Sequence, residues 1–221
     1  MFTKTTQKAT EYQSRLSYLL LLLLVLSACQ AQTGSNVDRI VGGGWEGCEA
    51  VFEYGSKSLS NVDTLPLFAS SSPKLKLSGT VYQKDGRTPA EGVILYIYHT
   101  NREGLYQRND DEKGWGRRHG FIRGWVKTDK DGSYTFYTFR PAAYPSGAEP
   151  EHIHIFVKEP NINEYFIDDF VFDDDPLLTP KKRKSLPERA GSGIVAPVPD
   201  EQGILQVRRD IVLGLNIPDY D

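Results

Sequence analysis

Two histidines stand one residue apart in the stretch Glu149-Pro-Glu-His-Ile-His-Ile-Phe-Val157. Successive side chains of a strand point to opposite faces, so His152 and His154 would share one face while Ile153 and Ile155 occupy the other. Two imidazoles at that spacing can bind a single metal ion. A His-x-His pair on its own is more often a hydrogen-bonded pair than a metal site, so its meaning depends on neighbouring donors.

Two tyrosines near turns are candidates for such donors. Tyr106 follows a long run of β-branched and aromatic residues that ends at Thr100, and Tyr144 precedes Pro145 eight residues before His152. Proline biases the preceding residue towards an extended conformation, which fixes the loop around Tyr144. A phenolate is a hard oxygen donor, and a bound ferric ion can lower the phenol pKa from its usual value of about 10. Because the chain has 12 tyrosines, packing is the competing interpretation of both residues.

The segments that must position these side chains are predicted to be strands. They are rich in β-branched and aromatic residues and are separated by glycine-containing turns such as Asp129-Lys-Asp-Gly132. Short strands at regular spacing with little helical periodicity predict an all-β fold, an antiparallel β-sandwich with few short helices. The predicted strands span residues 75–82, 92–100, 124–128, 133–139, 152–158, 166–172 and 204–213.

One helix is predicted over residues 180–190. Thr179 is a suitable N-cap and Pro180 suits the first helical position, whereas Pro187 should bend or end the helix. Residues 59–73 are rich in Ser, Pro and Asn, so an irregular connection is expected there.

The N-terminal segment has the pattern of an export signal. Residues 1–15 are basic, residues 16–28 are almost continuously apolar, and small residues precede Cys29. The apolar run is too short to span a bilayer comfortably. The pattern resembles a bacterial lipoprotein signal, which implies a lipid on Cys29 and a place in the cell envelope, and Gln30 in place of aspartate favours the outer membrane. An ordinary signal peptide or a membrane anchor is the competing interpretation.

The mature chain is expected to hold one domain. Residues 29–44 are largely small and polar, as in a flexible tether, and residues 45–221 are long enough for a sizeable core. With Cys29 lipidated, Cys48 has no partner for an internal disulfide, so a buried thiol is expected. The formal net charge of −3 for the whole sequence gives no indication of nucleic-acid binding.

The order of motifs from residue 77 to residue 213 resembles that of the intradiol ring-cleavage dioxygenases, the family that includes catechol and protocatechuate dioxygenases. Its most specific feature is the succession of a first tyrosine, a second tyrosine and a His-x-His pair, which is more informative than any single motif. The matching stretches are Gly79–Tyr98, Gly104-Leu-Tyr106, Arg123–Phe136, Thr138–Pro145 and Pro150-Glu-His-Ile-His154.

The resemblance implies a non-haem ferric ion, Fe(III), bound by Tyr106, Tyr144, His152 and His154, with solvent at an open position. It also implies a small aromatic diol and O2 as substrates, with the diol binding through both oxygens and displacing Tyr144. Cleavage between the two hydroxyl-bearing carbons would give a muconate-type diacid. The tasks of the protein would be ligation, orientation and charge balance.

Two candidate catalytic positions depart from the family pattern. Glu149 stands where family members usually carry an arginine, three positions before the first histidine, and Asp169 aligns with an expected glutamine. A carboxylate at position 149 should disfavour an anionic catecholate, because like charges repel. Arg123, Arg140 or Arg189 could restore the positive charge, although each is equally compatible with a surface ion pair.

Two other classes of protein are compatible with parts of this sequence. A non-enzymatic β-sandwich lipoprotein could use the hairpin at residues 128–136 and bind a sugar, a peptide or a partner at the envelope. Such a protein has no need for two tyrosines and a histidine pair together. A cupin-like metal barrel would use Glu159 after the histidine pair, but no second histidine motif follows His154.

Full-length protein made in a Gram-negative host should incorporate labelled fatty acid and enter the membrane fraction, because Cys29 is the predicted attachment site. Cys29→Ala should remain unlabelled, whereas Cys48→Ala is a matched control that should be labelled like the wild type. Equal labelling of wild type and Cys29→Ala would contradict the lipoprotein interpretation.

Overall fold

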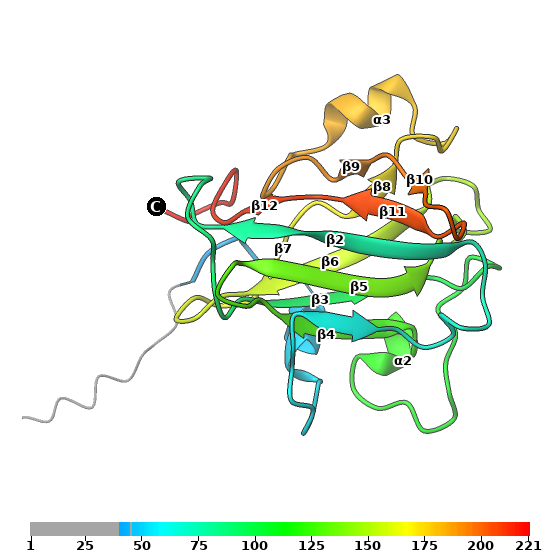
Figure 1. The fold of residues 1–221 in the computed structure, drawn as a ribbon, viewed down its shortest axis with the longest axis horizontal. Helices are drawn as coiled ribbons and strands as arrows, with labels where there is room; N and C mark the ends of the chain where they lie inside the picture. The colour runs from blue at the N-terminus through cyan, green and yellow to red at the C-terminus, as the bar shows by residue number, and fades with distance from the viewer. Residues whose placement is uncertain (1–39, 45) are drawn as a thin grey trace, which may run out of the picture. The chain divides into compact units, whose positions relative to one another are not determined.

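A computed structural model describes residues 40–44 and 46–221. Within these residues the chain forms two β-sheets that face each other (Figure 1), together with two short α-helices and one 3-10 helix. This confirms the predicted sandwich with few helices. The predicted signal, Cys29 and most of the predicted tether lie outside the described residues. None of the described helices is long and apolar enough to cross a membrane.

The first sheet holds six strands. In spatial order they are β1 (Val62–Thr64), β5 (Ser133–Phe139), β2 (Lys74–Tyr82), β11 (Leu205–Arg208) and β10 (Val198–Pro199), and β12 (Ile211–Val212) also pairs with β2. β2 and β5 are antiparallel along most of their length. Buried and half-buried side chains alternate along β2, as expected for a strand with one face on a core.

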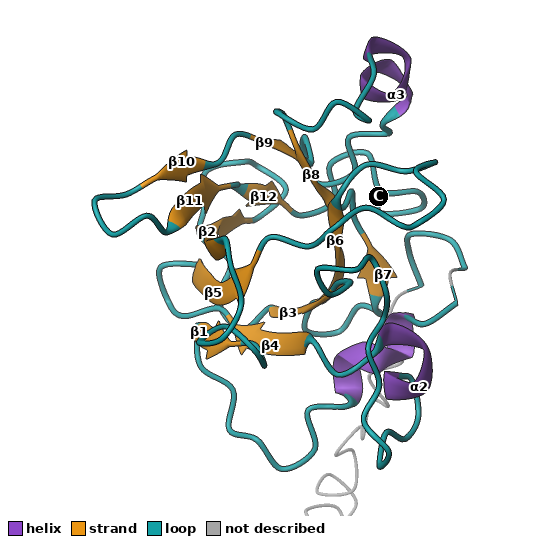
Figure 2. Cartoon of the chain, turned by 90° about the vertical axis from the view of Figure 1, so that its right-hand side faces the viewer, coloured by secondary structure: helices purple, strands orange, loops and turns teal. Residues whose placement is uncertain are grey.

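The second sheet also holds six strands. In spatial order they are β4 (Arg123–Lys127), β3 (Ile94–Tyr98), β6 (His152–Lys158), β8 (Phe170–Phe172) and β9 (Ile194–Val195), and β7 (Tyr165–Phe166) pairs with β6. β6 lies in the middle of this sheet and is antiparallel to β3. Figure 2 shows the two sheets as separate layers.

Apolar side chains of the two sheets meet to form the core. Leu75 and Leu77 from β2 and Ile153 and Ile155 from β6 are fully buried members of one cluster. Because side chains alternate along a strand, β6 directs its histidines to the opposite face. The histidine pair therefore lies on the outer face of the second sheet.

Part of this outer face is covered by a second layer of packing. The 3-10 helix η1 (Cys48–Phe52) and the aromatic rings of Tyr96, Trp125 and Phe156 form a separate buried cluster. The short helix α2 (Gly116–His119) lies on the same side of the sheet (Figure 2). Cys48 is buried as predicted, and its burial raises the pKa of the thiol to about 12. The thiol is therefore protonated and unreactive at neutral pH.

Several elements differ from the sequence-based expectation. The predicted strand 166–172 is divided into β7 and β8, and 204–213 is divided into β11 and β12. β1 lies inside the connection that was expected to be irregular. Helix α3 (Pro180–Ser185) ends before Pro187, and the Thr179 hydroxyl caps its first turn as predicted, accepting from the Lys182 amide at 3.3 Å.

The two sheets are mixed rather than purely antiparallel. Among the described strands, four pairs are parallel: β1 with β5, β11 with β2, β12 with β2, and β8 with β9. Parallel partners need long crossover connections. Such distant pairings leave no local hairpin pattern in the sequence, which is why the sequence predicted only antiparallel neighbours.

The packed part of the chain begins earlier than predicted. Val41 is buried in the core, and the Gly42 amide donates to the Pro218 carbonyl at 2.7 Å. Residues 41 and 42 are therefore fixed on the body of the domain, although the sequence places them in the flexible tether.

His99 is a buried polar residue between the two sheets. Its Nδ1 donates to the Thr100 carbonyl at 2.7 Å, so its Nε2 accepts from the Thr138 hydroxyl at 2.7 Å. Burial lowers the pKa of His99 from 6.5 to about 4, because the charged form loses its hydration. The folded chain therefore holds this imidazole neutral.

Acid should destabilise the fold through His99. Below pH 6.5 the unfolded chain binds a proton at this position that the folded chain excludes down to about pH 4. The free energy of unfolding should fall by about 2 kcal/mol through this group between pH 7 and pH 5. His99→Gln should lose that part of the pH dependence, as measured by urea unfolding at both pH values. An unchanged pH dependence would contradict the assignment.

Candidate metal centre

Four predicted donor side chains from three segments meet on the outer face of the second sheet. His152 and His154 project from β6. Tyr106 lies in the loop after β3, which reaches the histidines because Tyr98 on β3 pairs with His154 on β6. Tyr144 lies in the loop after β5.

The two tyrosine loops are held against each other. The Thr100 hydroxyl donates to the Ala142 carbonyl at 2.7 Å. Gly104 has a φ of +75°, and a Cβ at this position would lie 2.1 Å from the Ala143 carbonyl oxygen. Glycine is required here because any side chain would separate the loops. The close approach brings the two phenol oxygens together.

The donor atoms lie within contact distance of one another. The Tyr106 Oη is 2.7 Å from the His154 Nε2 and makes a shorter contact with the Tyr144 Oη. The Tyr144 Oη lies 3.1 Å from the His152 Nε2 and 3.4 Å from the His154 Nε2. The two Nε2 atoms are 3.2 Å apart.

Both imidazoles have a fixed orientation. The His152 Nδ1 lies 2.7 Å from the Pro150 carbonyl oxygen, and the His154 Nδ1 lies 3.0 Å from the Asp169 Oδ2. Each Nδ1 must donate to these acceptors, so in a neutral ring each Nε2 carries a lone pair. Both lone pairs are directed into the cluster. Carboxylates and carbonyls play this role behind metal-binding histidines, where they fix the tautomer.

The cluster has more acceptors than protons. When both rings are neutral, its five close contacts share only two phenol protons, because each Nδ1 holds the ring hydrogen and each Nε2 carries none. A cation among the four atoms would be attracted to all of them. Donor atoms bound at about 2.1 Å to one transition-metal ion are roughly 3.0–3.4 Å apart. Three of the five separations, at 3.1, 3.2 and 3.4 Å, lie in this range, and the two contacts of the Tyr106 Oη are shorter. Two phenol oxygens and two imidazole nitrogens therefore fit a ferric ion.

Burial changes the pKa values of the donor side chains. It raises the pKa of the Tyr106 and Tyr144 phenols, so both are protonated at neutral pH when no cation is near. It lowers the pKa of His152, which keeps that ring neutral. Ion binding would therefore release protons from the tyrosines and none from His152.

Asp169, which the sequence analysis aligned with an expected glutamine, lies behind the histidine pair, with its Oδ2 at 3.0 Å from the His154 Nδ1. It supports His154 from behind, and the loop that carries it is fixed from the first sheet. The buried Arg209 donates to the Asp168 carbonyl at 2.5 Å, while the Tyr134 hydroxyl holds the Arg209 carbonyl at 2.7 Å. The sequence analysis missed Arg209, because its contacts lie far away along the chain.

An aromatic stack fixes the plane of His154. The Tyr98 ring stacks on the His154 ring at 4.5 Å and 22°. The same Tyr98 ring also stacks on the His119 ring, at 3.8 Å and 5°. The Tyr96 hydroxyl is 2.9 Å from the His119 Nδ1. Burial lowers the pKa of His119 to about 3, so this ring is neutral. The sequence analysis did not assign a role to Tyr98 or His119.

Glu149 lies at the mouth of a cavity beside the donor cluster. The cavity has a volume of about 420 Å³, and Tyr144, His152 and His154 line it. The Glu149 carboxylate is 3.4 Å from the Lys182 Nζ, which also donates to the Ala148 carbonyl. Glu149 therefore has a cationic partner of its own, and no contact joins it to the four donor atoms.

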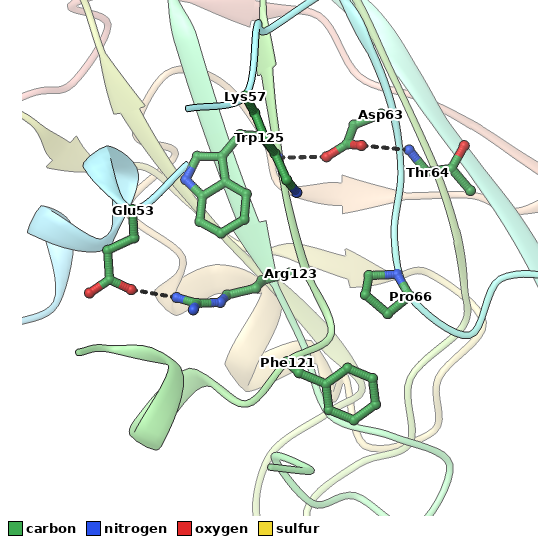
Figure 3. A pocket seen from close by; sticks show the side chains of 8 residues that line it. All are labelled: Glu53, Lys57, Asp63, Thr64, Pro66, Phe121, Arg123 and Trp125. Carbon is green, nitrogen blue, oxygen red and sulfur yellow. Dashed lines mark hydrogen bonds and ion pairs between the residues drawn. The ribbon is translucent and has the colours of Figure 1, made fainter. Parts of the chain in front are cut away.

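The three candidate arginines are engaged elsewhere. Figure 3 shows Arg123 beside another pocket, where it donates to Glu53 at 2.5 Å. Arg140 donates to Glu151 at 2.5 Å and to Asp174 at 2.8 Å. Arg189 donates to backbone carbonyls and lies 3.6 Å from the centre of the Phe166 ring. None of the three lines the cavity beside the donor cluster.

Glu159, which a cupin-like barrel would use as a metal ligand, has other partners. Its carboxylate accepts from the Tyr165 hydroxyl at 2.5 Å and from the Tyr220 hydroxyl at 2.8 Å. Along the described part of the chain, the cluster of acidic and histidine side chains suited to a metal contains Asp169 and the histidine pair, without Glu159. The geometry does not support the cupin-like alternative.

Comparison with solved structures shows the same fold. Hydroxyquinol 1,2-dioxygenase from Pseudomonas putida DLL-E4 aligns with a TM-score of 0.52 and 19% identity, over 85% of this chain and 70% of that one. Catechol 1,2-dioxygenase from Pseudomonas arvilla C-1 aligns with a TM-score of 0.52 and 18% identity, over 94% of this chain and 76% of that one.

Sequence relatives are consistent with this fold. Catechol 1,2-dioxygenase 1 of Acinetobacter lwoffii is 32% identical over 121 residues, which is 47% of this chain and 37% of that protein. The protocatechuate 3,4-dioxygenase beta chain of Burkholderia cepacia is 26% identical over 137 residues, which is 57% of this chain and 58% of that protein. The match thus covers less than two thirds of each relative. The family model described as Dioxygenase matches residues 69–196, more than half of the chain. The chain belongs to the intradiol ring-cleavage dioxygenase family.

Proposed function

We propose that this chain is a non-haem Fe(III) dioxygenase that inserts O2 into a catechol-type ring and cleaves it between the two hydroxyl-bearing carbons. The observation that carries the proposal is the convergence of two phenol oxygens and two imidazole nitrogens with too few protons to satisfy them. Family membership supports the reaction class, and the names of the relatives support a catechol-type substrate.

The four side chains would balance most of the charge of the ion. Tyr106 and Tyr144 would bind as phenolates and offset two of three positive charges, while the two histidines would bind as neutral rings. A bound ferric ion would supply the Lewis acidity that favours the ionised diol and its reaction with O2. Asp169 and the Pro150 carbonyl would keep both Nε2 atoms directed at the ion.

Of the four donor side chains, Tyr144 is the one that the substrate would displace most easily. It lines both this cavity and a second one of about 500 Å³ at the cluster, whereas Tyr106 lines only the second. The residues that follow Tyr144, 145–149, are exposed. Tyr106 instead packs at 5.6 Å against the buried Tyr98 ring. On leaving, the Tyr144 oxygen would accept a proton from a substrate hydroxyl, which keeps the total charge unchanged.

The enzyme would act at the cell envelope, held there by a lipid on Cys29. The basic segment, the apolar run and the small residues before Cys29 support this location. Gln30 supports the outer membrane as the site of the anchor.

Removing single donors should separate colour from metal retention. Tyr106→Phe and Tyr144→Phe should each change the visible tyrosinate-to-iron absorption, because each removes one phenolate and keeps the ring that packs. His152→Ala and His154→Ala should lose the iron, because three protein donors hold it poorly. Metal analysis and visible spectra measure both effects.

Tyr137→Phe is the matched control for the tyrosine variants, because Tyr137 lies on β5 in the first sheet. It should keep the iron and the wild-type spectrum. Unchanged spectra for both Tyr106→Phe and Tyr144→Phe would contradict the proposed ligand set, as would full iron retention after either histidine is removed.

Asp169 should control how tightly the ion is held. Asp169→Ala should weaken iron binding by about 10–100-fold, because the His154 ring loses the acceptor that orients it. Asp169→Asn should lose less affinity, since its amide oxygen can still accept from Nδ1. Competition with a chelator measures the effect, and Asp174→Asn, which changes an exposed carboxylate, is the control. Equal affinities for wild type and Asp169→Ala would refute this role.

A further inference from the structure

The cavity beside the donor cluster is larger than one aromatic ring requires. Its volume of about 420 Å³ lies in the range of sites for ligands of drug size. Tyr144, His152 and His154 form one part of its wall. A diol bound at the cluster would fill only that part, so the remaining volume is available to a substituent on the ring.

The rest of the wall is mainly apolar. Most of its residues come from the β7–β8 segment and from α3 and the segments that flank it. Leu178 is buried and Leu186 is half-buried at the end of the helix. A substituent in this volume would exchange water for apolar contacts. The apolar side chains in this part of the wall are Phe166, Ile167, Val171, Leu178, Leu186 and Pro187.

The charged groups of the cavity already have partners. The Asp168 carboxylate accepts from the amides of Glu188 and Arg189, each at 3.0 Å. Asp169 is bonded to His154, and Lys182 at the mouth is bonded to Glu149 and to a backbone carbonyl. A charged substituent would have to break one of these pairs or lose its hydration without compensation.

We propose that the preferred substrate is a catechol that carries an uncharged, apolar substituent, rather than catechol itself or a catechol with a carboxylate. This inference rests on the proposed ring-cleavage function and assigns its substrate class. The apolar wall would contact the substituent, and the carboxylate of Glu149 at the mouth would disfavour an anionic one. The described lining of this cavity contains no arginine, and Arg118, which lines the second cavity at the cluster, is paired with Glu46.

The test compares four diols with the iron-loaded full-length protein: catechol, 4-propylcatechol, dihydrocaffeic acid and dopamine. Dissociation constants come from visible titrations without O2, and turnover comes from O2 uptake. Each buried methylene strengthens binding roughly fourfold, so 4-propylcatechol should bind at least about tenfold more tightly than catechol. Dihydrocaffeic acid, with a carboxylate on a chain of similar length, should lose that advantage.

Variants of the wall test where the substituent lies. Leu186→Trp should fill the cavity and reduce the preference for 4-propylcatechol over catechol by at least about fivefold, while catechol binding stays nearly unchanged. Leu215→Trp introduces the same side chain at an exposed position outside the cavity and should change neither constant. Glu149→Gln should strengthen binding of dihydrocaffeic acid relative to 4-propylcatechol, because it removes a repelling charge.

The outcomes separate this inference from the proposed function. Binding and turnover of all four diols with equal affinity, or tightest binding of dihydrocaffeic acid or dopamine, would overturn the substrate class while the ring-cleavage function stands. Equal effects of Leu186→Trp on catechol and 4-propylcatechol would also overturn it. If iron-loaded protein neither binds nor oxidises any of the four, both the function and the substrate class fail.

Discussion

The site depends on one constraint, which is that the two histidine Nε2 atoms are directed at the same point. Alternation along β6 places both rings on the outer face while their neighbours anchor the strand in the core. The Pro150 carbonyl and the Asp169 carboxylate then fix each Nδ1 as a donor. Two lone pairs 3.2 Å apart, with two phenol oxygens beside them, form a centre that favours a cation. Three further sets of contacts hold this arrangement in place. They are the contact between the two tyrosine loops, the stack of Tyr98 on His154, and the bond from Arg209 to the loop of Asp169.

Both sheets contribute to that constraint. The second sheet carries the histidines and, through Tyr98, the stack that holds the His154 ring. The first sheet contributes Arg209, whose guanidinium crosses to the loop of Asp169. A sandwich can therefore support a rigid centre on an outer face, because the layer behind it fixes the loops. A non-enzymatic β-sandwich that only binds a ligand or partner would not need four converging donor side chains. Family membership does not favour that alternative either.

The sequence predicted the parts of this structure that have a local signal. The period-two pattern located β5 and β6, and the order of tyrosines and histidines named the four side chains that meet. It missed β1, whose three residues are exposed or half-buried and show no apolar pattern. The family pattern alone drew attention to Asp169, whereas its contact with the His154 Nδ1 depends on how the segment between β7 and β8 lies against β6. Arg209 and the Tyr98 stack depend on contacts between distant segments, which spacing along the chain does not encode.

We propose that four side chains of this chain hold one ferric ion. Iron analysis combined with the visible spectrum of protein made in iron-replete medium, or reconstituted with ferric iron, tests it most directly. We expect about one iron per chain and the charge-transfer colour of tyrosinate bound to ferric iron, which zinc does not give. A colourless, iron-free protein after attempted reconstitution would contradict it.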